Sequence, residues 1–302
     1  MKLVISGSQS FIGRELIRLC GERGIEWHGL DARPPAHRNE VRADIRQPGI
    51  ALPPADALVH LAAISRDADC RRDPASAFAV NVGGTLHLLD AAVAAGIPQV
   101  VFASSEWVYP DAERTWTEEM PIDAGAIRGE YALSKLTGER LVAIAAAAGR
   151  ISGTVLRFGI VYGPRLENWS AVEALYHAVA TRDTVEVGSL STARRFIHVR
   201  DVAEGIAAAV GRRGFEVFNL SGDSLIRLAD VIEASNRVLH RRVNACERDA
   251  AHPSVRDAAN HKARRELGWA PRIDLEAGLR TLGGDEEPEM NANQRELAGR
   301  PL

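Results

Sequence analysis

The chain lacks an excess of basic charge and any long hydrophobic run. Its 302 residues include 37 Lys and Arg against 40 Asp and Glu, a formal net charge of −3. Because binding to a phosphate backbone needs concentrated basic side chains, we expect no nucleic-acid partner. The longest nearly pure apolar run, Leu141 to Ala148, is much shorter than the ~20 residues that cross a bilayer, so we expect no membrane partner either.

Cysteine is scarce as well. Cys20, Cys70 and Cys246 stand far apart, and an odd, scattered set predicts reduced thiols and a cytoplasmic location. Residues 1–7 lack the apolar stretch and cleavage site of a signal peptide. Neither the cysteines nor the nine histidines show zinc-ligand spacing, so the sequence predicts no metal site.

Hydrophobic residues, in contrast, make up 46% of the chain, and short apolar runs alternate with helical patterns. This alternation predicts a parallel sheet with helices on both faces, an α/β doubly wound fold of the Rossmann type. The predicted strands are residues 2–6, 26–31, 57–62, 99–104 and 151–158, and the predicted helices are 11–23, 75–95 and 130–148.

The pattern becomes less regular after Pro164, which predicts a smaller C-terminal α/β lobe for the substrate. Residues 283–302 are polar, without periodicity, and predict a disordered tail. The expected division is a dinucleotide-binding domain of residues 1–163, to which 195–219 return, and a substrate lobe of residues 164–194 and 220–282.

The first predicted strand leads into Gly7-Ser8-Gln9-Ser10-Phe11-Ile12-Gly13, which opens the first helix. Such a junction makes a pyrophosphate site, because glycine lets the backbone approach the anion and free N–H groups at the helix start point at it. Ser10 stands where a glycine is usual, and a plain strand–turn–helix junction is the alternative interpretation. The residues expected to bind the cofactor here are Gly7, Ser10, Phe11, Ile12 and Gly13.

Asp31 ends the second predicted strand, 24 positions after Gly7. A carboxylate at this place accepts hydrogen bonds from the adenosine ribose hydroxyls and repels a 2′-phosphate, which favours NAD over NADP. Arg33 would offset that repulsion and leaves NADP open. Asp44 and Ile45 are expected to flank the adenine, with a solvated loop acid as the alternative for Asp44.

Tyr131 and Lys135 lie four positions apart, on one face of a predicted helix. The ammonium is expected to lower the phenol pKa, which is near 10 in a free tyrosine, and to bond a nicotinamide ribose. The same spacing also occurs on ordinary solvated helices. Ser104 and Ser105 end a strand at the carboxyl edge of the sheet, where ligands bind in open α/β folds. We expect Ser105 to bond the reacting oxygen and Ser104 to cap the strand.

Taken together, these segments resemble the extended short-chain dehydrogenase/reductase superfamily, specifically its NAD-dependent nucleotide-sugar epimerase/dehydratase family. The resemblance covers residues 1–282 and implies bound NAD, a sugar-nucleotide substrate and hydride transfer by an epimerase or oxidoreductase. It rests on the loop 7–13, the segments 60–63, 81–85 and 104–109, the pair Tyr131 and Lys135, and the segments 156–164, 194–202 and 267–271.

The same resemblance implies roles for single residues. Tyr131 would be the general base, Lys135 its electrostatic partner and Ser105 the hydroxyl that orients the substrate oxygen. For Asn81 a buried structural role is an equal interpretation, and for Arg194 an exposed loop position is the alternative. The implied ligand contacts are Leu61, Ala62 and Ala63 with the cofactor's pyrophosphate and ribose, Asn81 with the cofactor, Phe158 and Ile160 with the nicotinamide, and Arg194 with the substrate diphosphate.

Glu106 and Trp107 depart from the pattern of 4,6-dehydratases, in which an acid or hydroxyl is followed by a Glu that drives elimination. Here the Glu comes first and a Trp second, which disfavours a standard dehydratase. Glu106 would bond sugar hydroxyls or face solvent. The alternatives to an epimerase or oxidoreductase are a dehydratase that uses Glu106 and a non-catalytic NAD-binding protein. The resemblance further implies a homodimer formed by the helices 75–95 and 130–148.

Overall fold

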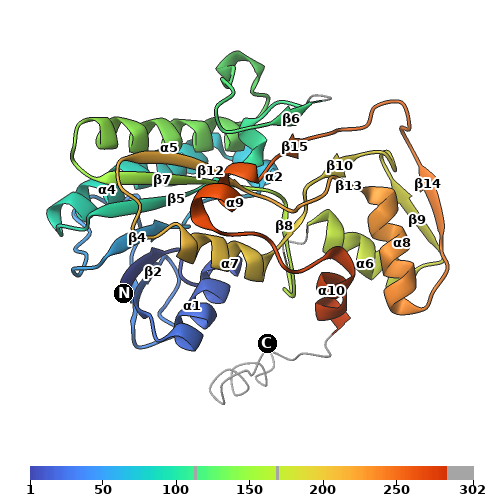
Figure 1. Cartoon of the computed structure of the whole chain (residues 1–302), viewed down its shortest axis with the longest axis horizontal. Helices are drawn as coiled ribbons and strands as arrows, with labels where there is room; N and C mark the ends of the chain where they lie inside the picture. The colour runs from blue at the N-terminus through green and yellow to red at the C-terminus, as the bar shows by residue number, and fades with distance from the viewer. Residues whose placement is uncertain (112–113, 168–169, 284–302) are drawn as a thin grey trace.

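The computed structural model describes residues 1–111, 114–167 and 170–283, so the predicted tail lies outside the described residues apart from Gly283. Its centre is a seven-stranded parallel sheet in the order β12-β7-β5-β4-β1-β2-β3 (Figure 1). The strands are β1 (Lys2–Ser6), β2 (Glu26–Asp31), β3 (Glu40–Arg42), β4 (Ala57–His60), β5 (Gln99–Ser105), β7 (Ser152–Phe158) and β12 (Phe215–Leu220). The predicted doubly wound α/β fold is confirmed.

Helices cover both faces of this sheet, α1 (Phe11–Arg23) and α7 (Val199–Ala208) on one, α4 (Gly84–Ala94) and α5 (Glu130–Ala147) on the other (Figure 1). Side chains alternate along each strand, so Leu3 packs toward α1 while Val4 packs toward α4. Two separate cores result, and both faces of the strands are buried, which explains their nearly continuous apolar sequences.

The helix predicted over residues 75–95 is interrupted in the structure. It consists of α3 (Pro74–Phe78), a π-helical turn η1 (Ala79–Gly83) and α4. A π-helical turn is a frequent mark of a functional site, and this one contains the buried Asn81. Within the described residues this stretch, Pro74–Ala94, is the one helix that passes a length and hydropathy test for membrane spans. The signal is weak, because core helices such as this one pass the same test.

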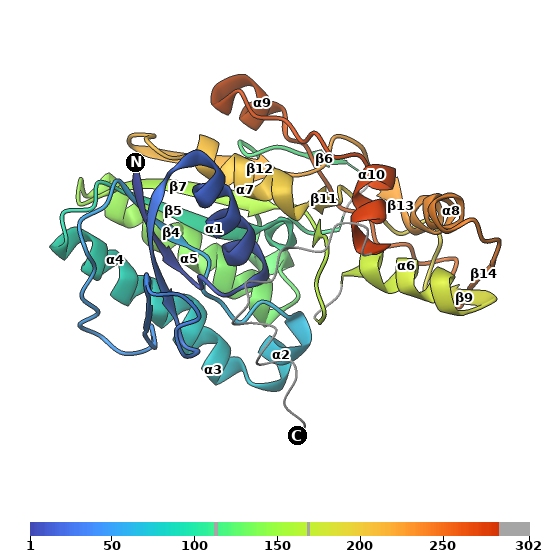
Figure 2. The ribbon, with the colours of Figure 1, turned by 90° about the horizontal axis from the view of Figure 1, so that it is seen from below.

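A second group of elements gathers at one end of the molecule in both views, around a core of its own (Figures 1 and 2). It contains α6 (Ala171–Thr181), α8 (Leu228–Leu239) and α10 (Leu275–Arg280), with the strand pairs β9 (Thr184–Val187) and β14 (Asn244–Glu247), and β10 (Ala193–Arg194) and β13 (Ile226–Arg227). The division of the chain into domains stays a prediction, although β12 does place residues 215–220 in the main sheet.

Short elements link the two groups. The pairs are β8 (Val161–Tyr162) with β11 (Ile197–His198) and β6 (Thr115–Trp116) with β15 (Asp257–Ala258). The remaining helices are α2 (Asp67–Arg72), α9 (His261–Leu267) and the short turns η2 (Glu106–Val108), η3 (Ala124–Ala126) and η4 (Thr281–Gly283).

Candidate active site

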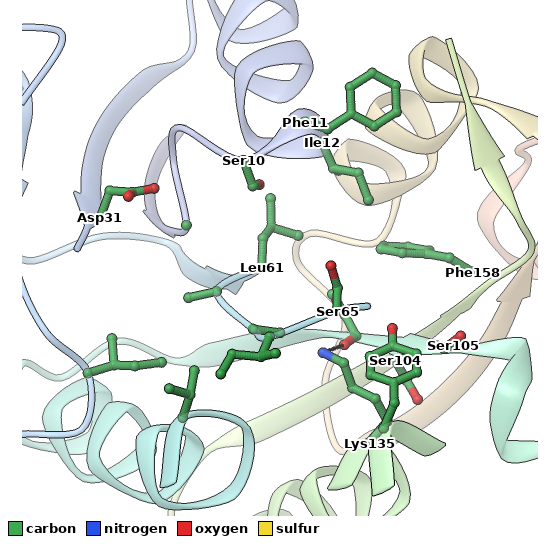
Figure 3. A pocket seen from close by; sticks show the side chains of 18 of the residues that line it. Ser10, Phe11, Ile12, Asp31, Leu61, Ser65, Ser104, Ser105, Lys135 and Phe158 are labelled. Atoms are coloured by element: carbon green, nitrogen blue, oxygen red, sulfur yellow. Dashed lines mark hydrogen bonds between the residues drawn. The ribbon is translucent and has the colours of Figure 1, made fainter. Parts of the chain in front are cut away.

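A cleft of about 540 Å³ follows the carboxyl ends of the central strands (Figure 3). This is the edge at which open α/β sheets bind ligands, because the strand order reverses there. Of the predicted site residues, the cleft is lined by Gly7, Ser10, Phe11, Ile12, Asp31, Arg33, Asp44, Ile45, Leu61, Ala62, Ala63, Ser105, Tyr131, Lys135, Phe158 and Ile160. The structure places Gly13, Asn81, Glu106 and Arg194 outside this lining.

Several lining residues were not predicted from the sequence. Most are apolar neighbours of predicted ones, such as Leu30 and Ala32 beside Asp31, and adjacency at a strand end was the signal that would have found them. Arg165, which follows a Gly-Pro turn, carried no such signal, and its guanidinium lies 4.4 Å from the centre of the Phe11 ring. The additional lining residues are Leu30, Ala32, Ala43, Arg46, Ile64, Ser65, Val80, Ala103, Ser104, Trp107, Gly159, Val161 and Arg165.

The loop between β1 and α1 brings backbone close to backbone. Gly7 has a φ of +71°, and a Cβ there would lie 2.7 Å from the Ala62 nitrogen. A Cβ on Gly13 would lie 2.3 Å from the Gly7 oxygen, so only glycine at position 13 lets α1 pack this closely against the loop. Ser10 is the N-cap of α1, and its hydroxyl accepts a 3.1 Å hydrogen bond from the Gly13 N–H. The serine in place of a glycine therefore stabilises the helix start that faces the cleft.

Asp31 lies at the opposite end of the cleft from Ser105 and Lys135 (Figure 3). Its carboxylate accepts hydrogen bonds from the Gln9 amide at 3.0 Å and from the Arg33 side chain at 2.9 and 3.0 Å. Burial opposes ionisation, but the bonds from Arg33 and Gln9 outweigh it and hold the pKa of Asp31 below its usual range. Arg33 thus does neutralise this acid, as the sequence suggested for a cofactor carrying a 2′-phosphate.

Asp44, like Asp31, lines the cleft and pairs with a nearby arginine. It pairs with the exposed Arg46, whose Nη2 lies 2.6 Å from a carboxylate oxygen, and this hydrogen bonding lowers the pKa of Asp44. Asp44 is therefore both a solvated acid and, with Ile45, part of the cleft wall.

Ser105, Tyr131 and Lys135 meet at the other end, from the end of β5 and the first two turns of α5. The Ser105 hydroxyl is near enough to the Tyr131 phenol to lower the pKa of that phenol. The Lys135 ammonium donates to the Ala103 carbonyl oxygen at 2.8 Å and lies 6.0 Å from the centre of the Tyr131 ring. Two chain segments, β5 and α5, thus converge on one point of the cleft wall.

The electrostatics of this group differ from the expectation. Burial raises the pKa of Tyr131 to about 12, and the nearby Ser105 hydroxyl offsets this rise only in part. Burial also lowers the pKa of Lys135 to about 8. The expected lowering of the phenol pKa by the ammonium is absent, because Lys135 is bonded to a backbone carbonyl and both groups are desolvated.

Asn81 is buried and lies outside the cleft lining. Its amide accepts from the Ile64 N–H at 2.8 Å and donates to the Ile64 carbonyl at 2.9 Å and the Ser134 hydroxyl at 3.0 Å. These bonds fit the structural interpretation of Asn81, and its contact with the cofactor stays a prediction. Asn81 therefore links the loop after β4, which carries Ile64, to the helix α5, which carries Tyr131.

A buried ion pair joins α5 to β7. Glu139 on α5 accepts from the Arg157 Nη2 at 2.7 Å and Nε at 2.9 Å, and from the Ser104 hydroxyl at 2.5 Å. Arg157 also donates to the Tyr109 hydroxyl, which donates to Asn219 on β12. The network joins α5, β5, β7 and β12 behind Ser105, and Ser104 belongs to it and does not cap the strand.

Glu106 is completely buried and does not face solvent. Neither carboxylate oxygen has a hydrogen-bond partner among the described residues, and its nearest cation is the Arg194 Nε at 3.5 Å. Burial raises the pKa of Glu106 to about 7. Arg194 is not an exposed loop residue, because its guanidinium donates to the Ser254 carbonyl at 2.7 Å and hydroxyl at 2.6 Å and keeps only 11% of its side chain exposed.

In the part of the chain that the structure describes, no group of three or more His, Cys, Asp or Glu could hold a metal ion. The cleft does carry what a dinucleotide needs: a helix N-terminus for phosphates, an acid for ribose hydroxyls, apolar walls and a polar trio at the far end. A doubly wound sheet with such a cleft and a Ser–Tyr–Lys group defines an enzyme of the extended short-chain dehydrogenase/reductase type.

The comparison with known families agrees. Residues 3–221 match the family model described as NAD dependent epimerase/dehydratase family, and the chain belongs to this family.

Curated relatives show what the chain is similar to. The UDP-glucose 4-epimerase of Streptomyces lividans is 28% identical over 310 residues, 91% of this chain and 93% of the relative. The dTDP-glucose 4,6-dehydratase of Streptomyces griseus is 28% identical over 303 residues, 92% of this chain and 91% of the relative. Among solved structures, MoeE5 in complex with UDP-glucuronic acid and NAD has a TM-score of 0.84 at 27% identity, covering 93% of this chain and 97% of that one. MoeE5 has also been solved with UDP-glucose and NAD.

Proposed function

We propose that this protein is an NAD-dependent sugar-nucleotide epimerase or oxidoreductase in which Tyr131 is the general base. The observation that carries the proposal is that Ser105, Tyr131 and Lys135 together line the end of the cleft away from Asp31. The family and the ligands named for MoeE5 support the cofactor and the substrate class.

NAD fits the residues present. Asp31 would accept the adenosine ribose hydroxyls, and the N–H groups at the start of α1 would receive the pyrophosphate beside Gly7. Phe158 and Ile160 would flank the nicotinamide near Ser105. NADP stays open, because Arg33 already neutralises Asp31 and would meet a 2′-phosphate favourably.

When bound, NAD supplies the hydride acceptor. Ser105 holds the sugar hydroxyl against Tyr131, and Tyr131 accepts its proton as the C–H bond breaks. Tyr131 must be a phenolate to accept this proton, and Lys135, whose pKa is about 8 and which is cationic at neutral pH, would stabilise that phenolate against the burial that raises the phenol pKa. Because the keto sugar keeps the same contacts, its reduction on the opposite face gives an epimer, whereas its release completes an oxidation.

A 4,6-dehydratase that uses Glu106 is the second candidate. It has one specific support, because a carboxyl group with a pKa of about 7 is well suited to donate a proton near neutral pH. The two candidates differ in product mass, since a dehydratase removes one water and an epimerase removes nothing.

The test is a screen of UDP- and dTDP-hexoses with purified protein and added NAD, read by mass spectrometry and by NMR of the product sugar. An epimer of equal mass or a keto sugar supports the proposal. A product lighter by one water identifies the dehydratase instead. Binding of NAD without turnover of any sugar nucleotide would contradict both and leave a non-catalytic protein.

We further propose a homodimer formed through α4 and α5. Both helices expose apolar side chains, Leu86 and Val93 on α4 and Leu133 and Ile144 on α5, which a second copy would bury. Light scattering at micromolar concentration should give twice the monomer mass. A cytoplasmic location also stays a proposal, supported by three free cysteines.

A further inference from the structure

We propose that Glu106 selects the sugar of the substrate: it accepts hydroxyl groups of a neutral hexose and excludes uronic acids. The inference rests on the proposed function, because it needs a sugar nucleotide in the cleft. It extends that proposal by naming the chemical class of the sugar and the residue that recognises the sugar.

Glu106 presents acceptors without donors. Its side chain is 0% exposed, and both carboxylate oxygens lack a hydrogen-bond partner within the described ranges. A buried polar group without a partner is costly, and native proteins keep few of them. Two buried acceptor oxygens call for a ligand that brings donors, and the donors of a hexose are its hydroxyl groups.

Glu106 lies directly behind the wall of the cleft, between two residues that line it. It follows Ser105, which would hold the reacting hydroxyl, and precedes Trp107, which lines the cleft. Its carboxylate lies 3.5 Å from Arg194, the residue expected to meet the substrate diphosphate. A hexose whose reacting hydroxyl is held by Ser105 would therefore lie next to the segment that carries Glu106.

Arg194 forms an ion pair with the Glu106 carboxylate at 3.5 Å but donates no hydrogen bond to it. Arg194 comes from β10, and Arg256, on the segment before β15, pairs with Asp111 at 2.9 Å and stacks 4.8 Å from the centre of the Trp107 ring. Asp111 and Asp257 add negative charge near Glu106. The arginines are thus shared with other acids, and a uronate carboxylate, which has no donor to offer, would meet Glu106 as a like charge.

The experiment compares UDP-glucose with UDP-glucuronic acid at pH 8, above the Glu106 pKa of about 7. For the wild-type protein kcat/KM should favour UDP-glucose by at least about 100-fold, the scale of a buried like-charge contact. In Glu106→Gln that ratio should fall by at least about 10-fold, because the amide keeps the shape and loses the charge. Asp111→Asn is the matched control, since it removes a charge from the same arginines away from Ser105 and should leave the ratio within about 3-fold.

The outcomes separate the inference from the proposed function. A wild-type preference for UDP-glucuronic acid, or a ratio that Glu106→Gln leaves unchanged, overturns the inference while the enzyme stays a sugar-nucleotide enzyme. An equal change in Asp111→Asn also overturns it, because the effect would then be the charge of the whole cluster. Absence of turnover and of binding with every sugar nucleotide contradicts the proposed function itself.

Discussion

Two glutamates near the end of β5, Glu139 on α5 and Glu106 directly after the strand, are both completely buried but differ in their partners. Glu139 receives two hydrogen bonds from Arg157 and one from Ser104. Glu106 receives none from the described residues and has Arg194 at 3.5 Å. Equal burial therefore says little about the role of an acid, whereas its hydrogen-bond partners say a great deal.

We interpret this difference as one of role: Glu139 stabilises the fold, whereas Glu106 is available to bind a ligand. Glu139 and Arg157 satisfy each other and tie α5 to β7, the two elements that carry Tyr131 and Phe158. Native proteins keep few unsatisfied buried acids, and functional sites are where such exceptions are expected. The predictions below test this contrast.

Glu139→Gln should give the largest loss of stability. The amide leaves the Arg157 guanidinium buried without a counter-charge, and breaking such a pair costs about 3–5 kcal/mol. Urea denaturation measures the free energy of unfolding. Glu276→Gln, which disrupts the exposed pair with Arg237, is the control and should cost less than about 1 kcal/mol. Similar losses in both variants would refute the structural role of the Glu139 pair.

Glu106→Gln should act in the opposite direction. Burial raises the Glu106 pKa from 4.5 to about 7, so the folded state binds the extra proton between these values and loses stability as the pH rises through them. At about 1.4 kcal/mol for each pKa unit, the wild type gives up roughly 3 kcal/mol by pH 8. The variant avoids this loss, so it should be more stable than the wild type at pH 8 and nearly equal at pH 4.5. A variant less stable at both values would show that Glu106 is satisfied by the protein.

Ser104 and Ser105 should differ in the same way, one acting on stability and the other on activity, with smaller effects on stability than the glutamates. Ser104→Ala removes a hydrogen bond to a buried carboxylate and should lower the free energy of unfolding by about 1.5–3 kcal/mol. Ser105→Ala removes the partner of Tyr131, so it should reduce kcat about 100-fold and change stability by less than about 1 kcal/mol. Denaturation and steady-state kinetics on both variants measure the split, and a reversed pattern would contradict the placement of the two side chains.

The sequence predicts those parts of the site that depend on local pattern. Asp31 and Ser105 end apolar strands, and Tyr131 and Lys135 are one helical turn apart, so the topology alone brings them to one edge. Burial and pairing depend on contacts between distant segments, which no local pattern contains. The Glu139–Arg157 pair, the bonds of Asn81 and the isolation of Glu106 beside Arg194 are of this kind. The pKa of Tyr131 was mispredicted for the same reason, because desolvation is a property of the folded surroundings.

Tyr131→Phe tests the central claim most directly. The substitution removes only the phenolic oxygen, so NAD affinity, measured by calorimetry, should stay within about 3-fold of wild type. Turnover of the sugar nucleotide found in the screen should fall by about 100- to 10,000-fold, the usual contribution of a general base. Full turnover in Tyr131→Phe, with NAD still bound, would contradict the assignment of Tyr131 as the base and with it the proposed chemistry of the cleft.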